Sequence, residues 1–283
     1  MSQDPVLREW RAEGEDIETR FGTVHVHRQG EGEPGLLLLH GYPTSSYDWR
    51  PILPLLTLDF LGFGFSDKPK GHEYRLFEHA DVVEEVLAKA GAAGSVDVLA
   101  HDMGTSVATE LMARDQEKKL SFGLGRVVLC NGSVLLERAS LRPIQKLLRS
   151  RFGPVVSALS SRPIFTRQLA AVFSDAHPLS REDADRHWEL LAAGDGHRQL
   201  HKLTAYPHER VEQAPRWHGA VRDWPGTLGL LWGERDPVAT VAVLDGLREL
   251  RPAAEVITFE ELGHFPQTED PCRFAAALRD LLD

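Results

Sequence analysis

Asp102 stands where a strand-like segment turns into a helix-like segment. The apolar run "VDVL" (96–99) precedes it, and the helix-forming run "GTSVATELMARD" follows two residues later. A sharp strand-to-helix turn projects the residue at its apex, and it needs small residues two positions away on each side, as Ala100 and Gly104 are here. The spacing therefore predicts that the turn presents Asp102 as a nucleophile.

A carboxylate nucleophile restricts the chemistry. Attack on an acyl carbon would give an anhydride, so its useful targets are sp³ carbons that carry a leaving group or belong to a strained ring. The product of such an attack is an alkyl ester of Asp102, which an activated water must then hydrolyse. The residue type therefore argues against simple ester cleavage.

Two other interpretations of the segment remain open at this point. Shifting the register by four residues would make Ser106 the nucleophile, but that position lies inside the expected helix rather than at its mouth. Asp102 could also be only the N-cap of this helix, a common role for aspartate.

A histidine and a second aspartate follow in the order nucleophile, acid, histidine. Asp236 ends the apolar strand-like run "TLGLLWGERD", and His264 follows the next strand-like run. Each has an ordinary alternative, because an aspartate before proline makes a good turn and His264 could be any loop histidine. Together they predict that Asp236 orients His264 and that His264 activates the water.

The segment "LLLLHGYP" (36–43) supplies the remaining part of the predicted site, which is a set of backbone N–H groups. A glycine turn after a buried strand directs backbone N–H groups toward one point, where they can stabilise a developing oxyanion. The backbone N–H groups of Tyr42 and Met103 are the predicted donors. A plain turn at the end of a strand is the alternative.

The elements around these residues alternate between strand and helix. Strand-like runs are expected at 23–29, 35–41, 95–102, 125–133, 227–238 and 254–264, with helical runs such as 74–91 between them. This alternation predicts an α/β fold with a mostly parallel sheet covered on both faces. One irregularity is the near absence of a connector between the helix-like run ending at "PILPLL" and the strand before Asp59. Either a loop is deleted there or residues are absent from this numbering.

From about residue 134 the strand rhythm stops. The segment 134–222 contains helical runs and no convincing buried strand, and Ser180 followed by Asp183 marks one helix start. We therefore expect a core made of residues 1–133 and 223–283 with a helical lid, 134–222, inserted over the carboxyl edge of the sheet. Such an insertion encloses a pocket.

Composition limits the class of protein and the partners that are expected. The 283 residues are 42% hydrophobic and 26% charged, as in ordinary globular proteins. The net charge of −10 makes nucleic acid an unexpected partner, and no apolar run is long enough to span a membrane, so no membrane partner is expected either. Cys130 lies in an apolar run, far from Cys272, which fits a reducing cytoplasm. The oligomeric state is not readable.

Metal and cofactor sites are not expected. His25 and His27 share one face of a strand, and His197 and His201 are spaced for one face of a helix, but neither pair has an evident third ligand. The glycine-containing stretch "GFGFS" (62–66) lacks the lysine and the spacing of a phosphate-binding loop, so a structural turn is expected there.

Five motifs in this order carry a resemblance to a known family: "HGYPTSSYDWR", "DFLGFGFSDKP", "AHDMG", "WGERDPV" and "LGHFPQTEDP". They resemble the α/β-hydrolase superfamily, and within it the aspartate-nucleophile branch of epoxide hydrolases and haloalkane dehalogenases. "VVLCNGS" and "YPHERVEQAPRW", at the two ends of the lid, are most similar to the mesoderm-specific-transcript-like hydrolases. The resemblance implies an α/β-hydrolase fold with an eight-stranded sheet.

The resemblance also bears on the leaving group. Haloalkane dehalogenases place a tryptophan after the nucleophile to hold the halide, but Met103 has no side-chain donor. Epoxide hydrolases use lid tyrosines to protonate the ring oxygen, and Tyr206 is the only tyrosine in 134–222. The expected function is therefore an epoxide hydrolase-like reaction on a small apolar substrate and water, with Tyr206 contacting the substrate. A haloalkane dehalogenase-like hydrolase is the first alternative, and a non-catalytic ligand receptor on the same fold is the second.

Overall fold

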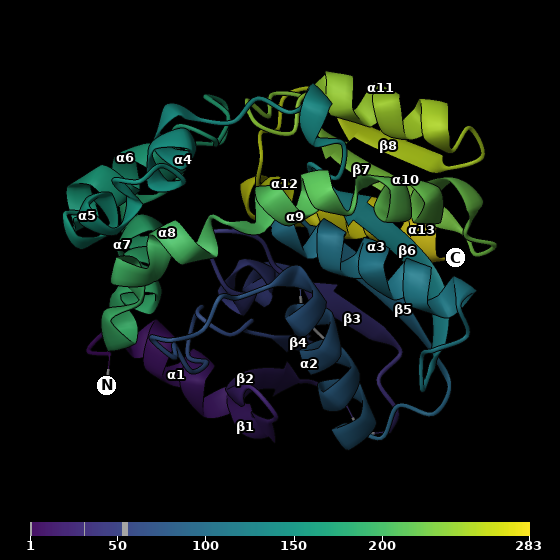
Figure 1. Ribbon diagram of the computed structural model, residues 1–283, viewed down its shortest axis with the longest axis horizontal. Coiled ribbons are helices and arrows are strands. Elements are labelled where there is room, and N and C mark those ends of the chain that lie inside the picture. The colour runs from purple at the N-terminus through teal and green to yellow at the C-terminus, as the bar shows by residue number, and fades with distance from the viewer. Residues whose placement is uncertain (1, 31, 53–55) are drawn as a thin grey trace.

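An eight-stranded sheet forms the centre of the computed structural model, which describes residues 2–30, 32–52 and 56–283 (Figure 1). The strand order is β1-β2-β4-β3-β5-β6-β7-β8, in which β1 pairs with β2 and β2 with β4 antiparallel and all other neighbours are parallel. The strands are β1 (Gly14–Thr19), β2 (Gly22–Arg28), β3 (Leu36–Leu39), β4 (Leu56–Leu58), β5 (Ser95–His101), β6 (Gly123–Cys130), β7 (Leu228–Gly233) and β8 (Glu255–Phe259).

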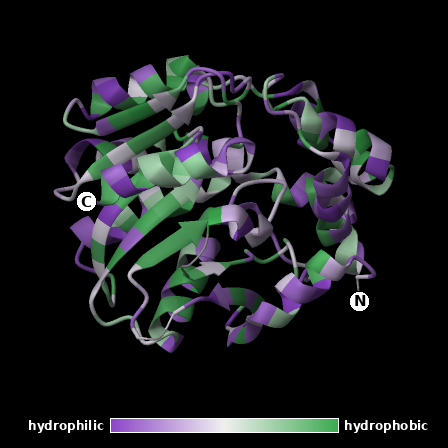
Figure 2. Ribbon diagram, turned by 180° about the vertical axis from the view of Figure 1, so that it is seen from behind, coloured by the Kyte–Doolittle hydropathy of each residue, from purple (hydrophilic) through white to green (hydrophobic). Residues whose placement is uncertain are grey.

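Helices cover both faces of this sheet. The side chains along β3 show why, because successive ones point to opposite faces and all of them are apolar. Leu37 and Leu39 belong to the apolar cluster that includes α2 and α3, whereas Leu36 and Leu38 belong to the cluster on the other face with α13. A strand buried on both faces reads as a continuous apolar run. Figure 2 shows the same division, with mainly hydrophobic strands inside and helices that carry hydrophilic residues outside. The core helices are α1 (Pro5–Glu13), η1 (Ser46–Ile52), α2 (Leu76–Lys89), α3 (Met103–Gln116), α11 (Val241–Leu250), α12 (Pro266–Glu269) and α13 (Pro271–Leu282).

Between β6 and β7 the described chain contains helices and no strand. They are η2 (Leu136–Arg138), α4 (Pro143–Leu148), α5 (Gly153–Ala158), α6 (Arg162–Ala170), α7 (Arg181–Ala192), η3 (Ala193–Gln199), α8 (Leu200–Leu203), α9 (Tyr206–Glu212) and α10 (Ala214–Asp223). Figure 1 places α4 to α8 beyond the sheet, whereas α9 and α10 lie over the core beside α3. The helix that begins after Ser180 has the expected cap, because the Ser180 hydroxyl accepts the amide hydrogen of Asp183 at 3.0 Å.

The predicted fold class is confirmed, with two differences in detail. The sequence reading did not identify β1, which is polar and forms an edge hairpin with β2, nor α1, which precedes it. The helix expected from Ser45 onward is a short 3₁₀ helix, η1. The irregular connector falls on residues 53–55, which lie outside the described residues, and β4 after it has only three residues. Within the described chain, no helix has both the length and the apolar character that a membrane crossing requires.

Candidate active site

Asp102 occupies the turn between β5 and α3. Its backbone φ of 45° and ψ of −108° form a sharp reversal that few non-glycine residues adopt. Gly104 allows the helix to start so close to the sheet, because a Cβ on this residue would lie 2.6 Å from the carbonyl oxygen of Leu39. The Asp102 side chain makes no capping hydrogen bond to α3. A helix cap therefore does not explain this residue.

One carboxylate oxygen of Asp102 is held by the loop after β3. The backbone N–H of Tyr42 donates to Oδ2 at 2.9 Å, and a Cβ on the neighbouring Gly41 would lie 2.6 Å from the Cβ of Asp102. The second predicted donor, the N–H of Met103, makes no hydrogen bond to this carboxylate in the described structure. Oδ1 accepts no hydrogen bond from the described residues, so it is the oxygen that is free to react.

His264 and Asp236 meet at the ends of neighbouring segments, as predicted. His264 Nδ1 lies 2.6 Å from Asp236 Oδ2, and both side chains are buried. The other oxygen of Asp236 accepts the backbone N–H groups of Val238 at 2.7 Å and Ala239 at 3.0 Å. The carboxylate is therefore fixed from both sides, which fixes the imidazole ring in turn.

Asn131 is a site residue that the sequence reading missed. Its side-chain N–H₂ donates to Asp236 Oδ2 at 2.8 Å and to the carbonyl oxygen of Gly233 at 3.0 Å, while its Oδ1 accepts the N–H of Gly233 at 2.8 Å. These bonds tie the end of β6 to the turn that carries Asp236. The sequence could have indicated Asn131, because it is a polar residue directly after the buried strand "VVLC", at the edge of the sheet where the site forms.

The surrounding charges favour the protonated form of His264. Burial by itself lowers the pKa of this group, but Asp236 and Asp102, both close by, outweigh burial and raise it to about 9. The imidazolium is thus stabilised by its hydrogen bond to Asp236 and by the nearby negative charge of Asp102. Loss of the negative charge on Asp102 would remove part of this stabilisation and lower the pKa of His264.

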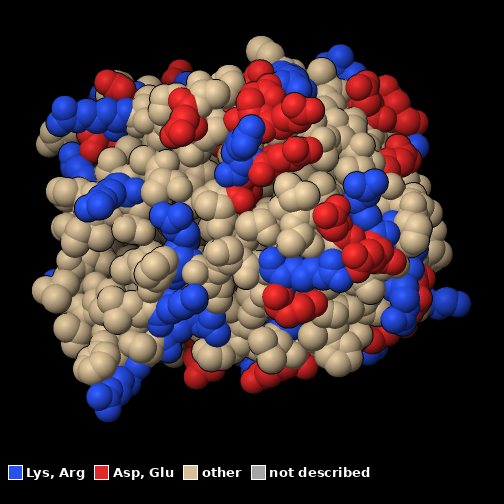
Figure 3. Space-filling model, turned by 90° about the horizontal axis from the view of Figure 1, so that it is seen from above, with Lys and Arg blue, Asp and Glu red and all other residues tan. Residues whose placement is uncertain are grey.

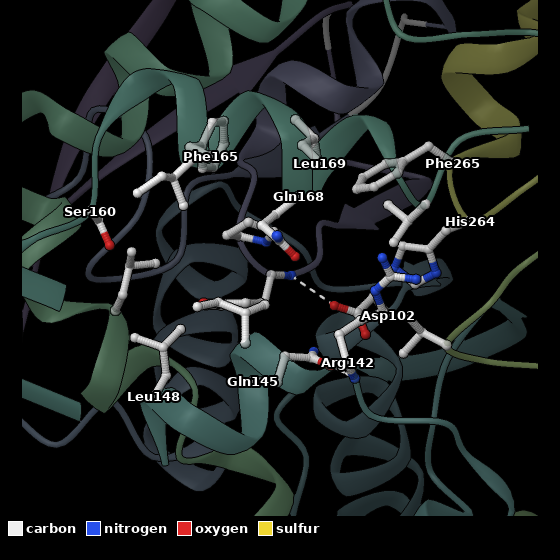
Figure 4. Close-up of a pocket in the computed structure, with 17 residues that line it drawn as sticks. Asp102, Arg142, Gln145, Leu148, Ser160, Phe165, Gln168, Leu169, His264 and Phe265 are labelled. Atoms are coloured by element: carbon white, nitrogen blue, oxygen red, sulfur yellow. Dashed lines mark hydrogen bonds between the residues drawn. The ribbon is translucent and has the colours of Figure 1, made fainter. Parts of the chain in front are cut away.

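Asp102 and His264 line the same cavity, and residues between β6 and β7 form its other wall (Figure 4). The wall is mostly apolar and includes Leu148, Ile164, Phe165, Leu169, Val172 and Phe265. Its polar side chains from the lid are Arg142, Gln145, Ser160 and Gln168. The Nε of Arg142 is buried without a hydrogen-bond partner in the described structure. An apolar pocket with a few polar groups suits a small organic molecule.

Tyr206 does not lie on the wall of this cavity. It is buried behind Tyr42, with a distance of 6.0 Å between the two ring centroids. Burial raises the pKa of Tyr206, and the nearby negative charge of Asp102 raises it further, so its hydroxyl stays protonated. The structure therefore brings Asp102, Tyr42, Asp236 and His264 together but leaves Tyr206 one layer behind them.

Arg210 links the lid to the turn that carries Asp102, and it was not predicted. This side chain is 1% exposed, and its guanidinium stacks over the ring of Tyr206 at 4.6 Å. Its Nη2 donates to the backbone carbonyl of Asp102 at 3.0 Å, and its Nε donates to the hydroxyl of Ser106 at 2.8 Å. Ser106 is fully buried and is not on the cavity wall, which argues against the register that would make it the nucleophile.

The histidine pairs considered as ligands have packing roles. The ring of His27 stacks on Trp10 at 3.6 Å, and His25 Nδ1 lies 2.9 Å from Asp16 Oδ1. His201 Nδ1 lies 3.1 Å from the hydroxyl of Ser157. Across the described parts of the chain, no three potential metal ligands gather in one place.

Comparison with known proteins agrees with this architecture. The model of the Alpha/beta hydrolase family matches residues 36–277. The chain is 56% identical over 285 residues to LipZ of Mycobacterium tuberculosis, a protein named as a hydrolase, and the match covers 98% of each chain. It is 33% identical to the mesoderm-specific transcript homolog protein of Homo sapiens, over 96% of this chain and 87% of that protein.

A solved structure has the same fold at low sequence identity. The haloalkane dehalogenase DbeA from Bradyrhizobium elkani superposes with a TM-score of 0.78 and 20% identity, over 95% of this chain and 97% of that one. At this identity the likeness shows the fold alone. The family match, however, spans most of the sequence, so this chain belongs to the alpha/beta hydrolase family.

Proposed function

We propose that the chain is a hydrolase that uses Asp102 as its nucleophile, and that it opens an epoxide on a small apolar substrate. The observation that carries the proposal is that the two oxygens of the Asp102 carboxylate have different surroundings. The Tyr42 amide holds Oδ2, Oδ1 accepts no hydrogen bond from the described residues, and His264, which Asp236 holds from behind, lines the same cavity as Asp102. A serine nucleophile is absent from this turn.

In the first step Oδ1 of Asp102 attacks an epoxide carbon. A carbon–oxygen bond to the enzyme forms, the ring C–O bond breaks, and the ring oxygen leaves as an alkoxide that takes up a proton. Tyr206 is the proposed proton donor, and it would need to reach past Tyr42, since the two rings lie 6.0 Å apart. The lid side chains on the wall, Arg142 and Gln168, offer N–H groups that can hold the same oxygen.

In the second step water hydrolyses the ester. His264 Nε2 takes a proton from a water molecule, and the hydroxide attacks the carboxyl carbon of Asp102. The negative charge that develops on Oδ2 is stabilised by the Tyr42 amide that already contacts it. Collapse of this intermediate breaks the bond to the alcohol oxygen, which takes up the proton held by His264. The carboxylic acid formed at Asp102 gives its proton to the Tyr206 phenolate left by the first step, so that the Asp102 carboxylate and the Tyr206 hydroxyl are both restored.

The two steps place different demands on His264, and its environment meets both. Before attack, the raised pKa of about 9 keeps the ring protonated beside two carboxylates. Esterification of Asp102 removes one of these charges, which lowers the pKa of His264 and makes it a base when a base is needed. Asp236 orients the ring and supports the imidazolium that forms after proton transfer.

A halide as the leaving group is the second candidate reaction. The N–H groups of Arg142, Gln145 and Gln168 on the cavity wall could hold an anion, although Met103 provides no side-chain donor beside the nucleophile. The non-catalytic receptor is the candidate from another class, and the ordered Asp236–His264 pair opposes it because binding alone has no use for a general base.

Trapping the ester tests the proposal directly. His264→Ala is incubated with styrene oxide, a long-chain terminal epoxide and the matching bromoalkanes, and the intact protein is weighed by mass spectrometry. We expect a stable mass increase with an epoxide, located on Asp102 by peptide mapping, because attack proceeds without His264 while hydrolysis does not. An increase only with the bromoalkanes would select the halide reaction.

The matched control is the double variant Asp102→Ala/His264→Ala, which should gain no mass with any compound. Ser106→Ala/His264→Ala should gain the same mass as His264→Ala. No adduct with any compound, together with no turnover by the wild-type protein, would favour the receptor function instead.

A further inference from the structure

The outer face of the first lid helices, α4 to α6, combines exposed apolar side chains with positive charge. Of the large hydrophobic side chains that are exposed in the described chain, five of seven lie between residues 147 and 164. Leu159 is the most exposed of them, at 71%. We call these five the lid patch: Leu147, Phe152, Val155, Leu159 and Ile164. A cluster of this kind on a protein surface usually marks an interaction site.

The segment that carries the lid patch is basic. Residues 139–174 contain six basic residues and no acidic residue, although the whole chain has a net charge of −10. The six are Arg142, Lys146, Arg149, Arg151, Arg162 and Arg167. Among the described residues, only Arg162 of this set forms a salt bridge, at 3.5 Å to Asp185. On the left of Figure 3, the side on which Figure 1 places these helices, blue and tan side chains predominate over red.

The cavity opens toward the same face. Ile164 belongs to the lid patch and also lines the cavity, at 48% exposure. Ser160 and Arg142, both partly exposed, line the cavity as well. An apolar molecule that rests against the lid patch therefore lies next to the entrance of the candidate active site.

We propose that the lid patch binds reversibly to the surface of an anionic lipid bilayer. Apolar side chains of α4 to α6 would insert among the acyl chains near the headgroups, and Lys146, Arg151 and Arg167 would contact the lipid phosphates. Short helices with apolar and basic side chains on one exposed face bind membranes in this way. An apolar substrate dissolved in the bilayer would then reach the cavity without crossing water.

Charge complementarity selects this partner over a second copy of the chain. A symmetric dimer through the lid patch would bring two faces of like charge together, which is unfavourable. The expectation that no membrane partner exists rested on the lack of a spanning segment. That property does not describe a local basic face that lies on a membrane rather than crossing it.

Flotation with lipid vesicles tests the proposal without any need for turnover. The wild-type chain is mixed with vesicles of phosphatidylcholine alone or of phosphatidylcholine with phosphatidylglycerol. We expect binding to the anionic vesicles to exceed binding to the neutral ones by at least about tenfold, and to weaken as salt screens the charges. Binding should fall by about tenfold or more in Lys146→Glu/Arg151→Glu, and also in Val155→Ser/Leu159→Ser.

The matched control carries the same kinds of substitution on α11, where Val241 and Arg248 are also exposed. Val241→Ser/Arg248→Glu should bind vesicles like the wild type. None of these residues lines the cavity, so all variants should still form the Asp102 adduct when combined with His264→Ala. Vesicle binding without an adduct would leave the docking proposal intact while contradicting the proposed chemistry.

Three outcomes would overturn the docking proposal. These are no binding to anionic vesicles, equal loss of binding in the α11 control, and a wild-type dimer in light scattering that the lid-patch substitutions dissociate. The last outcome would identify a second copy of the chain as the partner. Thermal unfolding of each variant shows whether it is folded before binding is compared.

Discussion

The two walls of the cavity are built differently. On the core side, Asp102 and His264 follow strand ends, and Asp236 lies behind His264. Each of the three is held by hydrogen bonds at 2.6 to 3.0 Å from backbone or buried side chains. On the lid side the wall consists of apolar side chains on short helices, and Arg142 leaves a buried Nε without a partner. The core thus fixes the atoms that we propose to react, whereas the lid offers a shape and a few adaptable polar groups.

This difference separates two properties of the protein. Preorganised groups at strand ends set which bond can be broken, because small displacements of a nucleophile or base reduce the rate strongly. Apolar contacts on the lid set which molecule is held, since each contributes a modest binding energy. Substitutions on the core wall should therefore abolish chemistry, and those on the lid wall should change selectivity.

Removing the nucleophile should have the largest effect. Asp102→Ala lacks the attacking oxygen and should reduce turnover of any substrate by about 10⁴-fold or more, since no other group can form the ester. Initial rates measured with the epoxide that forms an adduct would show this loss. Residual activity within tenfold of the wild type would mean that the core wall does not carry the chemistry.

Replacing the carboxylate beside His264 should change how stability depends on pH. In the wild type the pKa of His264 is raised from 6.5 to about 9, so its stabilising pair is fully present below pH 6.5 and is lost as the pH rises through about 9. This corresponds to about 3 kcal/mol of unfolding free energy lost across that range. In Asp236→Asn the loss should nearly disappear. Urea unfolding at several pH values measures it, and an equal pH dependence in both proteins would contradict the account.

Arg210 joins the two walls, so its replacement should affect rate more than stability. Arg210→Met removes the hydrogen bonds to the Asp102 carbonyl and to Ser106, and with them a support of the strained turn. We expect kcat to fall by about 10²-fold. Because a buried charge without a carboxylate partner adds little stability, the unfolding free energy should change by less than about 2 kcal/mol. Arg210→Lys should recover part of kcat, and a loss of stability without a loss of rate would assign a purely structural role.

Replacing a polar lid residue should have the smallest effect on activity. Gln168→Leu removes one wall donor and adds apolar surface, so KM should change by less than about tenfold and the ranking of substrates should shift. The yield of the trapped adduct in the His264→Ala background should stay the same. A loss of adduct formation would show that Gln168 takes part in the bond-breaking step, and it would blur the division between the two walls.

Local patterns in the sequence predicted much of this arrangement. The Asp102 turn was identified from Ala100 and Gly104, and the Ser180 cap from Asp183, because each signal lies within a few residues. The carboxyl ends of parallel strands then brought Asp236 and His264 to the same edge. Such inferences succeed because the geometry of a strand end or a helix start is set locally.

The features that were missed depend on contacts between distant segments. Arg210 reaches the backbone of Asp102, 108 residues earlier, and Asn131 reaches Asp236, 105 residues later. β1 exists through its pairing with β2 at an edge, and its own residues are mostly polar. The position of Tyr206 behind Tyr42 is also a matter of packing, which spacing along the chain does not determine.

The origin of the oxygen in the first turnover tests the central claim most directly. The enzyme, in excess, reacts once with the epoxide in water labelled with ¹⁸O, and the product and the peptide that contains Asp102 are analysed by mass spectrometry. If Asp102 forms the ester and water attacks its carboxyl carbon, the label enters Asp102 and the first product carries unlabelled enzyme oxygen. Label in the first product with none in Asp102 would mean that water attacks the substrate directly and that Asp102 is not the nucleophile.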